Sequence, residues 1–97
     1  MLRIEKEFDG RVSRLRLSGR IQWDRIACIR ASMHDDSSRK VLDQSEVTLV
    51  DVAVIHFLIG CEDEGIGLEK CPPYVREWIS RERVEQSALL TTDKHSV

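Results

Sequence analysis

Cysteine is scarce in this 97-residue chain, and the three that occur, Cys28, Cys61 and Cys71, show no C-x-x-C spacing. An odd number of cysteines argues against a disulfide framework, and the missing spacing argues against a zinc site. None of the three has a sequence neighbour that would activate a thiol. We therefore expect three reduced and buried cysteines.

The chain also lacks long apolar runs and a surplus of positive charge. No window approaches the roughly 18 continuous apolar residues of a membrane span, and the segment after Met1 lacks the apolar core of a signal peptide. The net charge is -2, the isoelectric point is near 5.9, and Lys and Arg are interspersed with Glu and Asp. These features disfavour nucleic-acid binding and predict one cytoplasmic domain with no membrane insertion.

The usual signatures of catalysis are missing as well. His34, His56 and His95 are isolated from one another, so none has the partner that metal binding or acid-base catalysis needs. Asp43 and Asp51 could meet as paired carboxylates in an acid-base or Mg²⁺ site. The stronger interpretation is that Asp43 bonds loop amides and Asp51 caps a helix. We expect no catalytic residue, no metal site and no cofactor.

The most informative stretch covers residues 40–59. Lys40–Leu42 and Val47–Val50 predict one buried strand in two apolar segments. After Asp51, the segment Val52–Cys61 predicts a helix that is apolar over most of its circumference. A buried strand that runs directly into a helix is the central unit of an α/β domain. Asp51 is predicted to cap the N-terminus of that helix.

The N-terminal part predicts an antiparallel hairpin followed by a helix. Residues 2–8 and 11–18 alternate apolar and polar side chains, and Asp9-Gly10 is a favoured turn pair between them. Gly19 is expected to break the second strand, although residues 20–22 could continue it. Asp24 is predicted to cap a helix that ends near His34, before the turn formers of residues 35–38.

The C-terminal part predicts a strand and a final helix. Gly65 is expected just beyond the end of the apolar helix. Residues 66–71 predict a short strand that pairs in parallel with the central strand, and Pro73 suits the first position of the next helix. That helix could extend through Leu89 or Leu90, and we expect residues 84–97 to form a C-terminal extension that is partly helical or irregular.

Three aromatic residues could mark an interface, because aromatic side chains anchor protein contacts. Tyr74 and Trp78 lie at helical spacing with other apolar residues, so we predict that both belong to the core. Trp23 stands between Gln22 and Asp24 and is the better candidate for an exposed position.

The predicted elements follow the order β-β-α-β-α-β-α, with a Gly after the second strand in Leu17-Ser18-Gly19-Arg20-Ile21 and with Val41-Leu42-Asp43 leading to Val47-Thr48-Leu49-Val50-Asp51. Together these features resemble the STAS domain, the family of bacterial anti-sigma-factor antagonists. The likeness in motif order and spacing covers about residues 2–83. It implies an α/β fold with a four-stranded mixed β-sheet, formed by the N-terminal hairpin plus parallel strands and packed with about three to four helices. Residues 1–83 would be the STAS-like domain.

The resemblance also implies a noncatalytic protein-interaction module in signalling regulation. In such antagonists a kinase phosphorylates a Ser or Thr two residues after the family's Asp, at a helix N-terminus that favours phosphate. Asp51 matches that Asp, but Ala53 stands at the phosphoacceptor position and cannot be phosphorylated. Val54 replaces the family's Gly. The usual Ser/Thr phosphoswitch is therefore absent at this position.

We expect the binding face to include the Asp51 turn and the following helix, with Asp51, Val52, Ala53 and His56 as partner-binding residues. The implied partner is an anti-sigma kinase-like protein or a transporter component. The alternative is a homo-oligomeric, ligand- or nucleotide-sensing STAS-like domain, such as a homodimer that associates through the tail or Trp23. A carboxylate- or thiol-dependent enzyme would require a deep pocket in which His joins Asp43, Asp51 or a cysteine.

Overall fold

The computed structural model describes residues 2–33 and 39–95, and the side chains as far as residue 85. The expected end of the first helix at His34 and the turn-forming residues 35–38 lie outside these ranges. Along the chain the elements are β1 (Arg3–Phe8), β2 (Val12–Ile21), the short 3₁₀ helix η1 (Trp23–Arg25), α1 (Ile26–Met33), β3 (Arg39–Val50), α2 (Val52–Asp63), β4 (Gly67–Glu69) and α3 (Pro73–His95).

The four strands form one mixed sheet in the order β1-β2-β3-β4. β1 pairs antiparallel with β2, whereas β2 with β3 and β3 with β4 pair in parallel. The predicted α/β class, the four-stranded mixed sheet and the N-terminal hairpin are therefore confirmed. The parallel pairing expected between the central strand and the strand after the apolar helix is confirmed as well.

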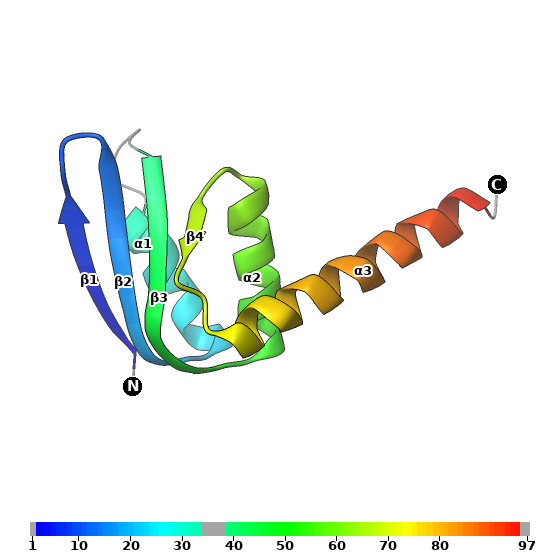
Figure 1. Ribbon diagram of the computed structural model, residues 1–97, viewed down its shortest axis with the longest axis horizontal. Helices are drawn as coiled ribbons and strands as arrows, with labels where there is room; N and C mark the ends of the chain where they lie inside the picture. The colour runs from blue at the N-terminus through cyan, green and yellow to red at the C-terminus, as the bar shows by residue number, and fades with distance from the viewer. Residues whose placement is uncertain (1, 34–38, 96–97) are drawn as a thin grey trace.

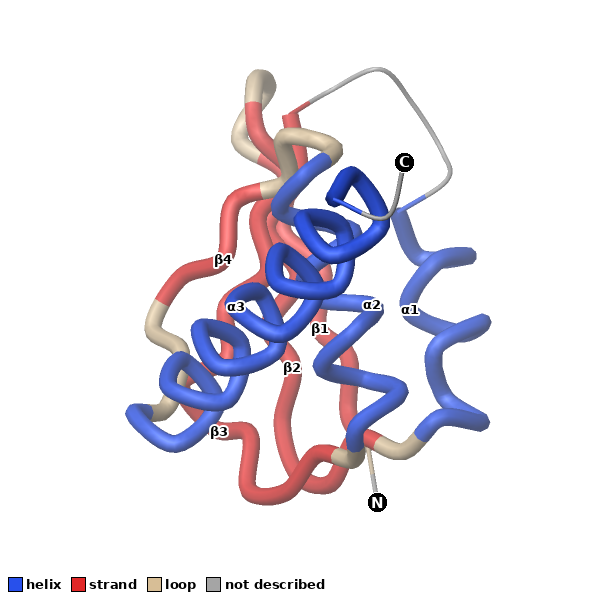
Figure 2. The backbone as a smooth tube through the Cα atoms, turned by 90° about the vertical axis from the view of Figure 1, so that its right-hand side faces the viewer, coloured by secondary structure: helices blue, strands red, loops and turns tan. Residues whose placement is uncertain are grey.

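The three α-helices form one layer against the sheet. Figure 2 shows α2 and α3 in front of the strands and α1 beside α2, on the right of the view. The side chains of β2 alternate between fully buried and partly exposed, as expected for a strand with one face against a core. α2 supplies the largest share of the core, because it is buried around most of its surface. Its buried residues are Val54, Ile55, Phe57, Leu58, Ile59 and Cys61.

The predicted Asp9-Gly10 turn is present. The Asp9 carboxylate accepts hydrogen bonds from the N–H groups of Arg11 and Val12 at 2.9 and 2.8 Å. Gly10 has a φ of +96°, which a residue with a side chain rarely adopts. These two backbone bonds lower the pKa of Asp9. The loop takes up three residues, so β2 begins at Val12 and not at Arg11.

Two register shifts bend the central pair of strands. Asp43 lies opposite Arg16, but Glu46 lies opposite Ser18, so β3 carries one extra residue there. Such β-bulges break the alternation of side chains between the two faces of a sheet. The neighbours Asp43 and Gln44 are accordingly both buried.

The second shift lies at Gly19 and gives β3 another extra residue, because Val47 faces Gly19 while Leu49 faces Arg20. Leu49 is thereby 52% exposed, although its strand segment was predicted to be buried. The prediction that Gly19 breaks the strand is wrong. Its φ of +88° is accommodated within the irregular pairing, and β2 continues to Ile21.

The start of the first helix also differs from the prediction. Gln22 is the N-cap of η1 and makes no capping bond with its side chain, while Asp24 lies inside the first turn. Asp24 is therefore not the cap. α1 follows directly and buries Ile29, whereas Cys28 on the same helix is exposed. The expectation of three buried cysteines is thus wrong for Cys28, which lies off the apolar face of α1, and is met only in part by Cys71, which is half-buried, whereas Cys61 is buried.

The end of α2 follows the sequence closely. Gly65 has a φ of +88° and donates its N–H to the carbonyl of Glu62 at 3.1 Å. Ile66 donates to the carbonyl of Cys61 at 2.9 Å. This pair of bonds is the Schellman ending, which satisfies the last carbonyls of a helix. Gly65 therefore occupies the position predicted for it.

β4 is shorter than the predicted strand over residues 66–71, and the positive φ of Lys70, 54°, follows its end. α3 begins at Pro73 as predicted, but it continues to His95, past the expected end at Leu89 or Leu90. Figure 1 shows its C-terminal half projecting away from the sheet and the other helices. No helix among the described residues is both long and apolar enough to cross a membrane.

Of the two aromatic residues predicted for the core, Trp78 packs against it while half-buried. The prediction for Tyr74 is wrong, since 41% of this residue is exposed. The Tyr74 hydroxyl donates to the Thr48 carbonyl at 2.7 Å. This bond ties the first turn of α3 to the second bulge of β3. It keeps the ring at the surface, because a tyrosine needs a partner for its hydroxyl.

Replacing Gln44 by leucine is expected to stabilise the fold. Gln44 is fully buried, and among the described residues neither atom of its amide has a hydrogen-bond partner. An unsatisfied buried polar group costs roughly 1–3 kcal/mol, so Q44L should raise the free energy of urea unfolding by about that amount. The control E46L replaces an exposed residue of the same strand and should change it by less than about 0.5 kcal/mol. A lower stability of Q44L would contradict the prediction.

Candidate functional site

The candidate site is the turn from β3 into α2, where Asp51 caps two helices at once. Its Oδ1 accepts from the Val54 N–H at 3.0 Å, which satisfies an unpaired donor in the first turn of α2. Its Oδ2 accepts from the Trp23 N–H at 2.9 Å, at the start of η1. The predicted cap of α2 is confirmed. The second bond replaces the cap that Asp24 was expected to provide.

This double cap joins two crossover connections at one end of the sheet. β2 and β3 are parallel, so both strands end at the same edge, shown at the lower end of the sheet in Figure 1. The carboxyl edge of parallel strands is where binding sites occur in open α/β sheets. Asp51 fixes the two segments that leave this edge, η1 and α2, relative to each other.

Large apolar side chains surround the Asp51 turn and are exposed. We call Trp23, Leu49 and Val52 the turn patch; they are 69%, 52% and 50% exposed. Next to Leu49, a shallow hollow of about 350 Å³ is lined by Arg20, Ile21, Gln22, Leu49, Val50 and Asp51. An exposed apolar cluster rimmed by polar groups is typical of a contact surface for another macromolecule.

The structure brings three of the four predicted partner-binding residues together. Asp51 and Val52 form the turn itself, and Ala53 is half-buried directly after them. His56 lies one helical turn further along α2, and its Nε2 is 2.6 Å from Glu82 Oε1 of α3. The imidazole edge of His56 therefore engages α3, while half of its side chain is open to solvent.

Asp43 and Asp51 do not form a carboxylate pair. They stand at opposite ends of a strand segment that spans on the order of 25 Å at about 3.3 Å per residue. Asp43 Oδ1 accepts from the Ser45 N–H at 3.0 Å, and Lys70 Nζ lies 3.9 Å from Oδ2. Burial alone would raise the pKa of Asp43, but the Ser45 bonds and Lys70 bring it below the ordinary value. The alternative of a paired acid-base or Mg²⁺ site is thus wrong.

No group of three potential metal ligands occurs among the residues with described side chains.

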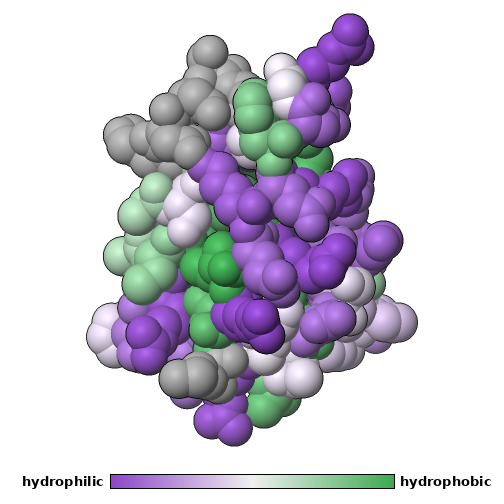
Figure 3. Space-filling model, turned by 90° about the vertical axis from the view of Figure 1, so that its left-hand side faces the viewer, coloured by the Kyte–Doolittle hydropathy of each residue, from purple (hydrophilic) through white to green (hydrophobic). Residues whose placement is uncertain are grey.

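The helix-free face of the sheet carries a hollow of about 500 Å³, near the hairpin turn and β4. Its charged residues include Arg14 and Glu69, which pair with each other. Figure 3 shows the side of the molecule towards β1 as mainly hydrophilic, with hydrophobic residues gathered near its centre.

Sequence reasoning missed two parts of the site. Leu49 reaches the surface only because of the bulge opposite Gly19 and Arg20, and a run of alternating residues gives no signal of an inserted residue. The bond from Trp23 to Asp51 joins positions 28 residues apart. The exposed location predicted for Trp23 is confirmed, but its amide partner has no local signature.

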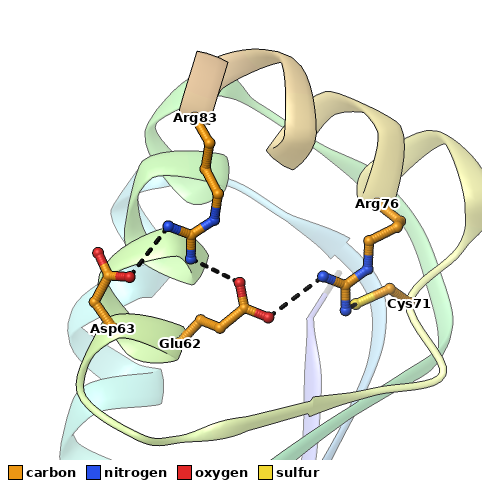
Figure 4. A network of polar contacts seen from close by, with 5 residues as sticks. All are labelled: Glu62, Asp63, Cys71, Arg76 and Arg83. Carbon is orange, nitrogen blue, oxygen red and sulfur yellow. Dashed lines mark hydrogen bonds and ion pairs between the residues drawn. The ribbon is translucent and has the colours of Figure 1, made fainter. Parts of the chain in front are cut away.

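A second set of polar contacts joins α2 to α3, near the C-terminal end of α2. Glu62 accepts from Arg83 at 2.7 Å and from Arg76 at 3.3 Å, while Arg83 also reaches Asp63 at 3.1 Å. Figure 4 shows Glu62 between the two guanidinium groups. The bonds to Arg83 and Arg76 lower the pKa of Glu62. The network holds the first part of α3 against α2, before α3 leaves the domain.

Comparison with known proteins adds no family assignment: no family model matches the chain, and no curated protein matches it. The site itself consists of a doubly capped turn, an exposed apolar patch and a hollow at the carboxyl edge of parallel strands.

Removing the Asp51 carboxylate should destabilise the protein through both caps. We expect D51A to lower the free energy of unfolding by roughly 2 kcal/mol, since each cap contributes about 1 kcal/mol. D51N keeps one oxygen acceptor and should lose about half as much. D24A, at the residue predicted and not found to be a cap, should stay within about 0.5 kcal/mol of the parent. Equal losses in D51A and D24A, measured by chemical denaturation, would contradict the double cap.

Glu62 should make the fold sensitive to acid. Because its pKa is lowered in the folded state, the stabilisation is complete above the ordinary value of 4.5 and is lost as pH falls through the lowered pKa. The stability difference between wild type and E62Q should therefore shrink as the pH falls below 4.5. Glu62 is partly exposed, so the effect should stay below about 1 kcal/mol. E77Q, outside the network on α3, serves as the control, and a difference independent of pH would exclude this role.

Proposed function

We propose that the chain is a noncatalytic, STAS-like protein-interaction module that binds a protein partner through the Asp51 turn. The observation that carries the proposal is the turn patch of Trp23, Leu49 and Val52, exposed around a turn that two capping bonds hold in place. The mixed sheet and its parallel β2-β3-β4 order agree with the fold that the STAS resemblance implies. The same resemblance assigns the family's regulatory position to this turn.

The arrangement suits a protein surface better than a small ligand. The hollow beside Leu49 is shallow, and its exposed neighbours are two large aliphatic residues and an indole. Aromatic anchors surrounded by apolar residues are typical of the energetic centre of protein interfaces. Because the caps fix the backbone beforehand, little ordering entropy would be lost on binding. The partner implied by the resemblance is an anti-sigma kinase-like protein or a transporter component.

Regulation of this surface would differ from that of a phosphorylated antagonist. Ala53 follows Val52 in the first turn of α2, where a phosphate would benefit from the helix N-terminus. Its methyl side chain carries no oxygen to accept one. Binding at the turn would therefore be constitutive with respect to phosphorylation at this position.

Binding is tested with a purified kinase, phosphatase or transporter component encoded beside the gene. We expect isothermal titration calorimetry to detect a complex that V52D and W23A each weaken at least tenfold, since central interface residues contribute about 1.4 kcal/mol or more. V84D, an equally drastic change at an exposed apolar residue of α3, should bind like the parent. Unchanged binding by V52D would exclude this face. A stable homodimer that buries the turn patch, detected by light scattering, would favour the homo-oligomeric alternative.

The missing switch leads to a gain-of-function test. A53S restores a hydroxyl at the family's acceptor position, so a kinase that binds the turn should phosphorylate this variant in the presence of ATP. The parent and the control A53V should remain unmodified in intact-mass spectra. Phosphorylated A53S should then bind the kinase more weakly, because the added charge of about -2 lies within the contact surface. An A53S variant that stays unmodified by a kinase that binds the turn would contradict the proposal.

A further inference from the structure

Cys71 stands in an unusual polar setting between β4 and α3. Its side chain is partly buried, and Arg76 Nη2 lies 3.6 Å from its Sγ. Figure 4 shows Arg76 reaching both the thiol and Glu62, which accepts from Nη1 of the same guanidinium at 3.3 Å. The thiol therefore borders the polar network between α2 and α3, and one cationic donor already points at it.

A second polar group approaches the thiol from the sheet. Parallel pairing places Leu42 beside Leu68 and Asp43 beside Glu69, so Gln44 lies next to the segment that follows β4. Gln44 is fully buried, and its amide has no hydrogen-bond partner among the described residues. Burial raises the pKa of the Cys71 thiol, and the charge of Arg76 and a weak approach of the Gln44 amide to the sulfur both oppose that rise. That approach does not reach the geometry of a hydrogen bond, so the amide remains unsatisfied within the described part of the chain.

We propose that Cys71 is a site of oxidation to sulfenic acid by hydrogen peroxide, and that Gln44 and Arg76 bind the oxygen atom that sulfur gains. The sulfur attacks one peroxide oxygen, so an S–O bond forms as the O–O bond breaks. The thiol and hydrogen peroxide become a sulfenic acid and water: sulfur loses two electrons and peroxide accepts them. The thiol proton and the second peroxide oxygen leave as water.

This setting determines the fate of the product more than the rate of its formation. A thiol with a raised pKa is a slow nucleophile, but the oxygen of a sulfenic acid is an acceptor that a thiol lacks. The guanidinium of Arg76 can donate to that oxygen in a charge-assisted bond. The Gln44 amide, which only approaches the sulfur in the reduced protein, would gain a full hydrogen bond to that oxygen, and a buried amide is costly to leave unsatisfied. Held in this way, the sulfenic acid is protected against further oxidation.

The other two cysteines provide internal comparisons. Cys28 is exposed on α1, whereas Cys61 is 2% exposed and its pKa is raised to about 11 by burial. Cys28 should therefore proceed readily from sulfenic to sulfinic acid. Cys61 should remain a thiol.

The test uses the full, reduced chain treated with hydrogen peroxide and trapped with dimedone, which labels sulfenic acids. Peptide mass spectrometry gives the ratio of sulfenic to sulfinic acid at each cysteine. We expect the ratio at Cys71 to exceed that at Cys28 by about tenfold or more, the factor that corresponds to one hydrogen bond of about 1.4 kcal/mol. In Q44L the ratio at Cys71 should fall by about the same factor, and at Cys28 it should not change.

Two outcomes would overturn the proposal: Cys71 remains a thiol under conditions that oxidise Cys28, or its ratio is unaffected by Q44L. Circular dichroism shows whether Q44L is folded. Q44M, which keeps the length of the side chain but removes its amide, is the second variant if it is not. Because the readout is the chemistry of Cys71, the result does not depend on whether a protein partner binds at Asp51.

Discussion

The carboxylate of Asp51 is the contact on which the candidate site depends. With one oxygen on Val54 and the other on Trp23, it joins the starts of α2 and η1, which leave the sheet from neighbouring parallel strands. Helix N-termini need external acceptors, and here one side chain supplies two helices. The two bonds hold in place the backbone from which the exposed side chains of Trp23 and Val52 project.

Local sequence signals predicted most of the fold. Asp9-Gly10, Gly65 and Pro73 mark a turn, a helix end and a helix start, and each acts through its own backbone or the residues next to it. The hairpin and the parallel pairing of β3 with β4 followed from the order of the predicted elements, whereas the four-stranded mixed sheet was implied by the STAS resemblance. What the sequence could not predict depends on contacts between distant segments. The second bulge of β3 leaves Leu49 exposed, and the N–H of Trp23 donates to Asp51, 28 residues away in the sequence.

The candidate site was also predicted only in part, because some of its contacts join segments that are distant in the sequence. Asp51 and its cap could be read directly, because the Asp precedes an apolar helix. His56 was assigned to the binding face from its position on α2 alone. Its pairing with Glu82 could not be predicted, because the two residues lie 26 positions apart in the sequence. A pair of Asp43 and Asp51 was the weaker of two interpretations, and the structure excludes it because a strand is too extended to let residues eight positions apart meet.

The double cap has a consequence for motion. Local opening of a protein proceeds in cooperative units, and segments that share a stabilising contact tend to open together. If the first turn of α2 opens, Asp51 moves and its hydrogen bond to the Trp23 N–H breaks as well. The start of η1, which leads into α1, therefore opens together with the start of α2. The two crossovers should therefore show matched hydrogen-exchange protection at Trp23 and Val54. A partner bound at one of them would rigidify the other without touching it.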